Sequence, residues 1–168
     1  MPSSRTGAIP DYKLRSIFAI DPGPEQSGWV TYRPDDLGVL ESGVWPNQRL
    51  LAELPRDSVG ARVAVEMIAS YGMAVGREVF ETCVWIGRFQ QAAHSPGQVL
   101  RIERRLIKLH HCGSARAKDT NIWQALVDRF GPVGTKAAPG PLYGVKSHAR
   151  AALALAVYVA DNWKELTP

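Results

Sequence analysis

The sequence lacks the features that mark secreted, membrane-spanning or zinc-stabilised proteins. Its 168 residues include two cysteines, Cys83 and Cys112, which are too few for a disulfide framework. No C-x-x-C or H-x₃-H pair provides the spacing of a zinc site. There is no positively charged start followed by an apolar signal core, and no run of about 18 apolar residues that could span a membrane. We therefore expect a soluble, cytoplasmic protein.

The composition is that of an ordinary globular domain with a moderate excess of positive charge. Hydrophobic residues make up 45% and charged residues 21% of the chain. The formal net charge of +4 allows a polyanionic partner such as nucleic acid without requiring one. Residues 1–16 are polar and contain Pro2, Gly7 and Pro10, so we expect a flexible N-terminal arm. Residues 17–168 show no internal repeat and are expected to form a single domain.

The hydrophobic pattern predicts an α/β protein with a mixed sheet. Three strand-like runs joined by short connections favour an antiparallel meander, and later strands alternate with helices. Asp119 and Ser147 are suited to cap the two helices that follow them, and residues 104–111 are compatible with either strand or helix. The expected strands are 17–20, 28–32, 39–45, 62–66 and 99–102, and the expected helices are 48–54 (ending before Pro55), 77–93, 120–130 and 147–163.

Two carboxylates end separate apolar strands. Asp21 closes the run Ile17–Ile20 and is followed by Pro22-Gly23, and Glu66 closes the run 62–65. An aspartate in this position can be no more than a turn former. Two carboxylates that meet at one end of a sheet, however, repel each other unless a cation joins them. Oxygen ligands favour Mg²⁺ or Mn²⁺, and a pair of such ions supports in-line attack of water on a phosphodiester.

Three motifs in order resemble a known family. Asp21-Pro22-Gly23 after the first strand, Glu66 at a later strand end and a C-terminal His148-x-x-Ala151-Ala152-Leu153 helix resemble the RuvC-type Holliday junction resolvases of the ribonuclease H-like superfamily. The run from Cys112 to Asp119 is most similar to RuvC-like proteins of bacteriophages, which would act in the bacterial host cytoplasm. The resemblance extends from about Ile17 to Trp163. It implies a ribonuclease H-like fold with a mixed five-stranded sheet flanked by helices.

The resemblance also implies an active site with Mg²⁺ or Mn²⁺, two ions per site. Asp21 and Glu66 take the places of the metal-binding carboxylates on the strands. The last helix of the family carries Asp or His and then Asp one turn later, so His148 matches the first position. The second falls on Ala151, which cannot bind a metal. His148 would act as a metal ligand or as a general base.

The departure at Ala151 leaves three explanations open. Asp21, Glu66 and His148 could form a minimal set that water or a substrate phosphate completes. Asp119 could approach from a neighbouring helix start and join the catalytic residues. The chain could instead be an inactivated member, natural or engineered, that binds junctions without cutting them. Simpler roles also remain open, since His148 could face solvent in the first turn of its helix and Asp119 could be only a helix cap.

A basic segment is the candidate nucleic-acid contact. Between residues 101 and 118 six cationic side chains accompany a single acidic one, Glu103, and such side chains provide most of the sequence-independent affinity for DNA. In the loop 69–76, Tyr71 could stack on an unpaired base at a junction centre. Arg77 and Arg88 are secondary candidates. The predicted DNA-binding residues are Arg101, Arg104, Arg105, Lys108, Arg116, Lys118, Tyr71 and Lys146.

The resulting hypothesis is a metal-dependent endonuclease that nicks four-way junctions symmetrically. A nearly two-fold symmetric substrate favours a C2 homodimer. We expect its surface on helix 77–93, at Val84, Trp85 and Phe89. A junction-binding protein without activity and a nuclease for flaps, other branched DNA or RNA are the alternatives. A kinase of the actin-like fold would need a second glycine-rich phosphate loop and a longer chain.

Overall fold

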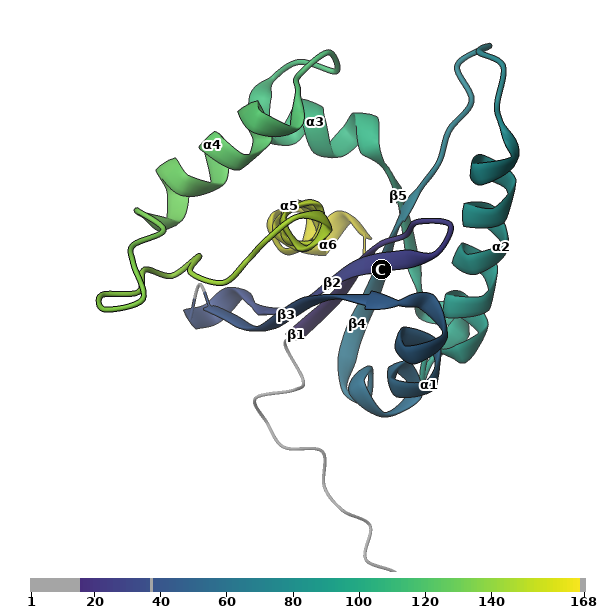
Figure 1. The fold of residues 1–168 in the computed structure, drawn as a ribbon, viewed down its shortest axis with the longest axis horizontal. Coiled ribbons are helices and arrows are strands. Elements are labelled where there is room, and N and C mark those ends of the chain that lie inside the picture. Colours follow the sequence, from purple (N-terminus) through teal and green to yellow (C-terminus); the bar gives the residue numbers. More distant parts are fainter. Residues whose placement is uncertain (1–15, 37, 167–168) are drawn as a thin grey trace, which may run out of the picture.

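The computed structural model describes residues 16–36 and 38–166 (Figure 1). The expected N-terminal arm, 1–16, lies outside this part of the chain except for Ser16, which already belongs to the first strand. Within the described ranges, no helix combines the length and apolar character needed to cross a bilayer.

A mixed five-stranded sheet forms the centre of the fold, as the sequence predicts. Its strand order is β3-β2-β1-β4-β5. The first three strands form an antiparallel meander, and β4 and β5 extend the sheet in parallel from β1. The strands are β1 (Ser16–Asp21), β2 (Gln26–Arg33), β3 (Gly38–Pro46), β4 (Ala61–Met67) and β5 (Leu100–Glu103).

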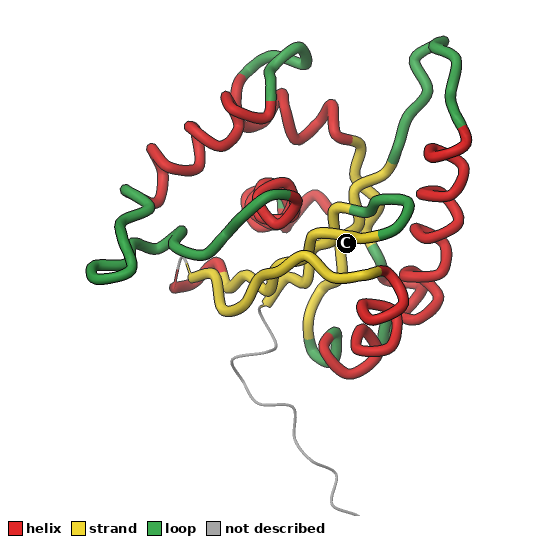
Figure 2. Tube along the Cα trace, in the orientation of Figure 1, coloured by secondary structure: helices red, strands yellow, loops and turns green. Residues whose placement is uncertain are grey.

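Helices cover both faces of the sheet. Figure 1 shows α3, α4, α5 and α6 on one face and α1 and α2 on the other. Two long loops lead into helices, 68–76 into α2 and 131–147 into α5 (Figure 2). The α-helices are α1 (Asn47–Asp57), α2 (Arg77–Ala92), α3 (Arg104–Cys112), α4 (Asp119–Phe130), α5 (His148–Asp161) and α6 (Trp163–Leu166). Two short 3₁₀ helices are η2 (Pro34–Asp36) and η3 (Pro96–Gln98).

Each face of the sheet buries its own apolar cluster. Phe18 and Ile20 of β1 pack with Leu50 and Leu54 of α1, whereas Ile17 and the other alternate residues of β1 pack beneath α5. This separation follows from the two-residue period of a strand. Helix α5 is buried over most of its length, and its many alanines let its backbone lie close to the sheet. The face beneath α5 is the one that receives the candidate site.

Three local expectations were wrong or are now decided. Helix α1 continues through Pro55 to Asp57. A proline this close to the helix end removes only one late hydrogen bond, and the buried Leu50 and Leu54 hold the helix on the sheet. Residues 104–112 are helical and end at Gly113, which adopts the left-handed conformation with a φ of 67°. Asp119 is the first residue of α4 and not its N-cap, which is Lys118.

Candidate active site

Asp21 and Glu66 end adjacent parallel strands on the same face of the sheet. The register of β1 and β4 pairs Ile20 with Val65, so the two carboxylates are the next residues on each strand. Ile20 and Val65 point into the cluster beneath α1 and α2. The alternation of side chains therefore turns Asp21 and Glu66 to the opposite face, toward α5. The prediction that these two strand ends converge is confirmed.

Gly28 lets the start of α5 reach this edge. Gly28 is the β2 partner of Asp21 in the sheet. A Cβ placed on Gly28 would overlap the backbone carbonyl of His148 and lie 2.6 Å from the nitrogen of Ala149. The missing side chain is thus what allows the helix backbone to lie against the strand. The residue before the helix, Ser147, has a φ of 49° and makes no side-chain capping bond. Ser147 therefore occupies the expected N-cap position, but its hydroxyl makes no capping hydrogen bond.

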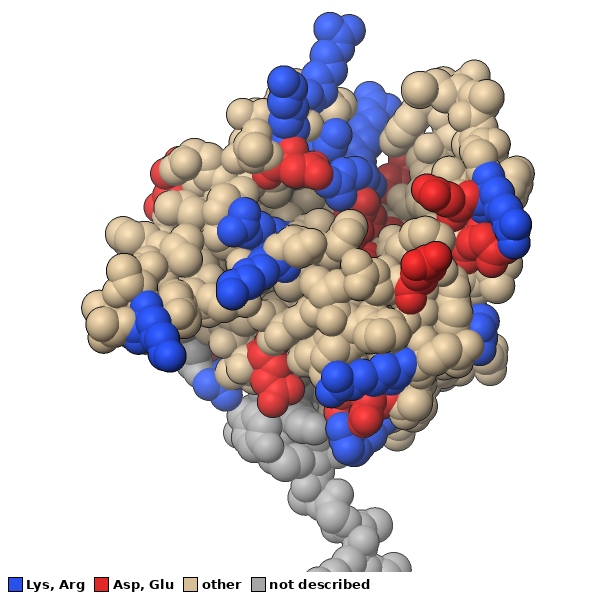
Figure 3. Space-filling model, viewed as in Figure 1, with Lys and Arg blue, Asp and Glu red and all other residues tan. Residues whose placement is uncertain are grey.

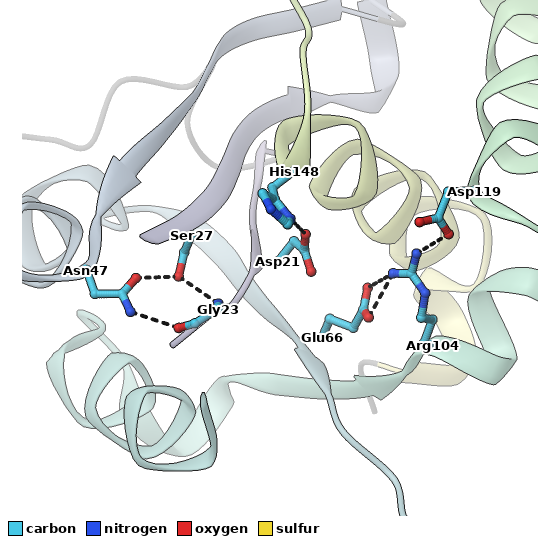
Figure 4. Close-up of polar contacts among 8 residues, drawn as sticks. All are labelled: Asp21, Gly23, Ser27, Asn47, Glu66, Arg104, Asp119 and His148. Atoms are coloured by element: carbon cyan, nitrogen blue, oxygen red, sulfur yellow. Dashed lines mark hydrogen bonds and ion pairs between the residues drawn. The ribbon is translucent and has the colours of Figure 1, made fainter. Parts of the chain in front are cut away.

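His148 meets Asp21 directly. Its Nδ1 lies 2.9 Å from Oδ2 of Asp21 (Figure 4). Asp21 is buried and the His148 side chain is 52% exposed. The hydrogen bond to Asp21 raises the pKa of His148 above its ordinary value, against the opposing effect of burial. With Nδ1 engaged by the carboxylate, Nε2 is the ring nitrogen left for a metal ion or a proton. His148 therefore lies in the same pocket as Asp21 and contacts it, with about half of its side chain open to solvent.

The carboxyl group of Glu66 has a strongly raised pKa. Its side chain is only 12% exposed. Burial, followed by the nearby charge of Asp21, raises the pKa of Glu66 to about 7 despite the opposing effect of Arg104. A carboxyl group perturbed in this way within a pocket is a recognised mark of a functional site.

Arg104 links Glu66 to Asp119. Its Nη1 donates to both carboxylate oxygens of Glu66, at 2.9 and 3.0 Å, and its Nη2 donates to Oδ1 of Asp119 (Figure 4). Arg104 is the first residue of α3 and Asp119 the first of α4, so one guanidinium ties two helix starts to the end of β4. Arg104 thus faces the carboxylates, whereas the sequence suggested a DNA contact.

A buried network fixes the turn that follows Asp21. The Ser27 hydroxyl donates to Oδ1 of Asn47 at 2.6 Å, and Nδ2 of Asn47 donates to the Gly23 carbonyl at 2.8 Å. The Gly23 amide donates in turn to Oγ of Ser27 at 3.3 Å. Asn47 and Ser27 are both almost fully buried. Sequence reasoning missed them, because a single Asn at a helix start carries no signal of what it contacts.

One pocket of about 860 Å³ contains the four residues predicted to be catalytic, and Ala151 lines it as well. These four residues are Asp21, Glu66, Asp119 and His148. Trp123 and Arg150 also line it, and sequence reasoning named neither. The Arg150 guanidinium lies over the Trp123 ring, 4.2 Å from its centroid. The position of Arg150 two residues after His148 is the only signal in the sequence that could have indicated it. The pocket is lined by Asp21, Glu66, Arg104, Ile107, Asp119, Thr120, Ile122, Trp123, Gln124, Ser147, His148, Arg150, Ala151 and Ala154.

The donor set suits a hard divalent cation, although it is not arranged as a finished metal cluster. Across residues 16–36 and 38–166, no three His, Cys, Asp or Glu side chains are grouped closely enough to hold one ion. The carboxylates are instead paired, Asp21 with His148 and Glu66 with Arg104. Their oxygens are nevertheless the ligands that Mg²⁺ and Mn²⁺ prefer. The bound guanidinium shows in addition that the Glu66 end of the pocket accommodates a cation. The chemical types of these donors therefore fit Mg²⁺ or Mn²⁺, whereas their spacing within residues 16–36 and 38–166 does not form a complete ligand set.

The other predicted DNA contacts are not among the residues that line this pocket. Arg101, Arg105, Arg116, Lys118 and Lys146 are exposed, and Lys108 is half-buried. Tyr71 is 61% exposed in the loop after β4. Its hydroxyl donates to Oε2 of Glu103 at 3.4 Å, which places this loop beside the end of β5.

The apolar surface expected on α2 is only partly present. Phe89 is fully buried and belongs to the core, so its assignment to a dimer surface is wrong. Ile86 and Phe89 are three residues apart and so lie on the same side of α2, the side that packs against the sheet. Trp85 is half-buried and carries the Arg88 guanidinium 4.1 Å from its ring centroid. Val84, at 58% exposure, remains outward.

Solved structures with the same architecture share little sequence with this chain. The structure of Thermus thermophilus RuvC matches with a TM-score of 0.64 at 21% identity, covering 89% of this chain and 96% of that one. The chain has the RuvC fold. T. thermophilus RuvC in complex with a Holliday junction substrate matches with a TM-score of 0.65 at 20% identity, covering 89% of this chain and 95% of that chain. No protein-family model matches the sequence, and no curated protein matches it significantly. The predicted ribonuclease H-like fold is confirmed.

Proposed function

We propose that this protein is a metal-dependent endonuclease that nicks four-way DNA junctions. The observation that carries the proposal is the meeting of Asp21, Glu66 and His148 in one pocket at the ends of two parallel strands. The RuvC fold supports it, because one RuvC of this fold has been solved with a Holliday junction substrate. The metal would be Mg²⁺ or Mn²⁺, with two ions per site, as the resemblance to the family implies.

In such a site the residues of this chain would have different roles. Asp21 and Glu66 would hold the metal, which when bound makes water a better nucleophile and offsets charge on the phosphate. The Asn47 network fixes the turn after Asp21 and so positions that carboxylate. His148 is anchored through Nδ1, and its Nε2 would bind the metal or accept a proton from the attacking water.

Basic side chains of α3 and of the connection to α4 would bind the phosphate backbone. Figure 3 shows Lys and Arg atoms gathered over α3 and the connection to α4, and acidic atoms in the hollow beneath them. Phosphates held by this rim would bring a strand across the carboxylates. We assign the rim to Arg105, Lys108, Arg116, Lys118 and Lys146, with Tyr71 available to stack on an unpaired base. Arg101 pairs with Val65 in the sheet, so its side chain is on the α2 face, away from the pocket.

A substrate panel tests the proposal. Purified protein would be incubated with an end-labelled four-way junction, a flap, a linear duplex of the same sequence and an RNA duplex, each with Mg²⁺, Mn²⁺ or EDTA. We expect paired nicks on strands of like polarity in the junction with either metal and none with EDTA. Cleavage that persists in EDTA would overturn metal dependence. Equal cleavage of the linear duplex would overturn junction selectivity, and preferred cleavage of the flap or RNA would assign the same chemistry to those substrates.

A junction-binding protein without activity is the second candidate. Ala151 in the pocket and the pairing of Glu66 with Arg104 favour it. The same samples decide this question in a gel-shift experiment. A shifted junction without nicks in any divalent ion supports the second candidate, and appearance of nicking in Ala151→Asp would identify the missing carboxylate as the reason.

Two finer assignments accompany the proposal. A C2 homodimer would place two active sites on one junction, and the exposed Phe80 and Val84 of α2 are the apolar residues that we assign to its surface.

The bacteriophage type rests on the run from Cys112 to Asp119 in the sequence. Action in the cytoplasm of a bacterial host would follow from that type.

A further inference from the structure

One guanidinium occupies the space between two carboxylates of the pocket. Arg104 chelates Glu66 through Nη1 and contacts Asp119 through Nη2 (Figure 4). Ala151 lines the same pocket, at the helix position where the resembled family carries its second metal-binding residue. The pocket therefore lacks a carboxylate on α5 and has an additional one on α4.

We propose that Asp119 supplies the carboxylate that is missing at Ala151, and that Arg104 holds the place of a divalent ion between Glu66 and Asp119 until that ion binds. This inference rests on the proposed metal-dependent function, and it assigns a ligand and a competing cation to that site. Asp119 would act on the ion directly or through one of the waters that Mg²⁺ retains.

The charges of the pocket favour exchange of the guanidinium for a divalent ion. Asp21 is buried and Glu66 is largely buried, with a 12% exposed side chain, at adjacent strand ends, and Asp119 adds a third carboxylate. Arg104 brings a single positive charge to Glu66 and Asp119. A divalent ion brings twice that charge to the same oxygens, so it satisfies the buried carboxylates more fully.

The positions of the two partners make the exchange mechanically simple. Arg104 is 32% exposed and stands at the start of α3, so its long side chain can turn outward without moving the helix. Asp119 is 76% exposed and is the first residue of α4, where the helix dipole favours a negative charge whether or not Arg104 is bound.

Metal binding in the absence of DNA tests the inference. The free-ion EPR signal of Mn²⁺ would be titrated against wild type, Asp119→Asn and Arg104→Gln, with folding verified by thermal unfolding. We expect Asp119→Asn to weaken Mn²⁺ binding about tenfold. Arg104→Gln should strengthen it about tenfold, because it removes a competing positive charge next to the ligands. Asp128→Asn is the matched control on α4, since Asp128 does not line the pocket, although Gln124, which donates a hydrogen bond to its carboxylate, does.

A second-site substitution separates a ligand from a structural salt bridge. Ala151→Asp added to Asp119→Asn should restore Mn²⁺ affinity, because it returns a carboxylate to the same pocket from α5. A purely structural role for Asp119 would give no such rescue. Unchanged affinity in Asp119→Asn, or unchanged or weaker affinity in Arg104→Gln, would overturn the inference. Failure of both wild type and Arg104→Gln to bind Mn²⁺ at millimolar concentration would overturn it as well.

The junction assay keeps this inference distinct from the proposed function. Metal-dependent nicking by wild type together with unchanged Mn²⁺ binding in Asp119→Asn would leave the function standing and reject the role of Asp119. Tight Mn²⁺ binding that responds to Asp119 and Arg104, with no nicking of any DNA, would keep the metal site and reject the nuclease.

Discussion

Nδ1 of His148 lies 2.9 Å from Oδ2 of Asp21, although 127 positions separate the two residues in the sequence. The contact joins the first strand of the sheet to the last long helix. It fixes the orientation of the imidazole and leaves Nε2 as the ring nitrogen available to a metal ion or a proton. Its role in chemistry and its role in stability can be separated by substitution.

Replacing His148 by alanine should remove activity while sparing DNA binding. The substitution deletes the anchored imidazole, and loss of a positioned proton acceptor or ligand is expected to slow junction nicking at least about 100-fold. Single-turnover nicking in Mg²⁺ and a junction gel shift would measure the two properties. His94→Ala is the control, because His94 follows α2 and its backbone amide bonds Ser58 outside the pocket lining. Nicking by His148→Ala at the wild-type rate would contradict this role.

Gly28→Ala should destabilise the protein and displace the start of α5. The new Cβ would overlap the backbone of His148, which cannot move aside as a flexible side chain could. We expect a loss of about 1–3 kcal/mol in the free energy of unfolding, measured by urea denaturation. Gly87→Ala on α2 is the matched control and should be neutral or stabilising, since no other part of the described chain lies within 4 Å of the position its Cβ would take. Equal effects of the two substitutions would show that the close approach at Gly28 does not matter.

Removal of the Asn47 side chain should loosen the turn beside Asp21. Asn47→Ala leaves the Gly23 carbonyl and the Ser27 hydroxyl without their buried partner. The expected cost is about 1–3 kcal/mol of unfolding free energy. Faster amide hydrogen exchange at Gly23, with little change in β5, would locate the effect at this turn. Unaltered exchange there would contradict the positioning role.

The ion pair of Asp161 should give stability that disappears in acid. Burial alone would raise the pKa of Asp161, but hydrogen bonds from Arg129 and His110 lower it below its ordinary value. A carboxylate whose pKa is lower in the folded state stabilises the protein above its unfolded pKa, about 3.9, and loses this effect as pH falls through the folded pKa. Asp161→Asn should therefore lower Tm at pH 7, and the difference from wild type should shrink below about pH 4. A difference that does not shrink as the pH falls below about 4 would contradict the assignment.

Much of the fold and half of the site geometry follow from local sequence patterns. The strand ends at Asp21 and Glu66 are visible because apolar runs stop there, and strand parity then places both on one face. The continuation of α1 through Pro55 was not predictable, because it depends on the burial of Leu50 and Leu54 against a sheet formed by other segments. Local patterns also could not show that Phe89 is buried, because this depends on which side of α2 packs against the sheet.

The contacts of Arg104 show where a sequence reaches its limit. In a run of six cationic residues, nothing local distinguishes the one that faces the carboxylates from those that face solvent. The distinction arises from the start of α3 at residue 104, directly after β5, which aims this side chain at the end of β4. The same is true of the Arg150 guanidinium over Trp123, which depends on the packing of α4 beside α5.

The most direct test of the account is the separation of cutting from binding at the two strand-end carboxylates. Wild type, Asp21→Asn and Glu66→Gln would be compared on a four-way junction in Mg²⁺, with nicking and gel shift measured on the same samples. The account predicts that both substitutions abolish nicking, while junction binding stays within about threefold of wild type because the basic rim is intact. Nicking at the wild-type rate by either variant would contradict a metal site built on Asp21 and Glu66.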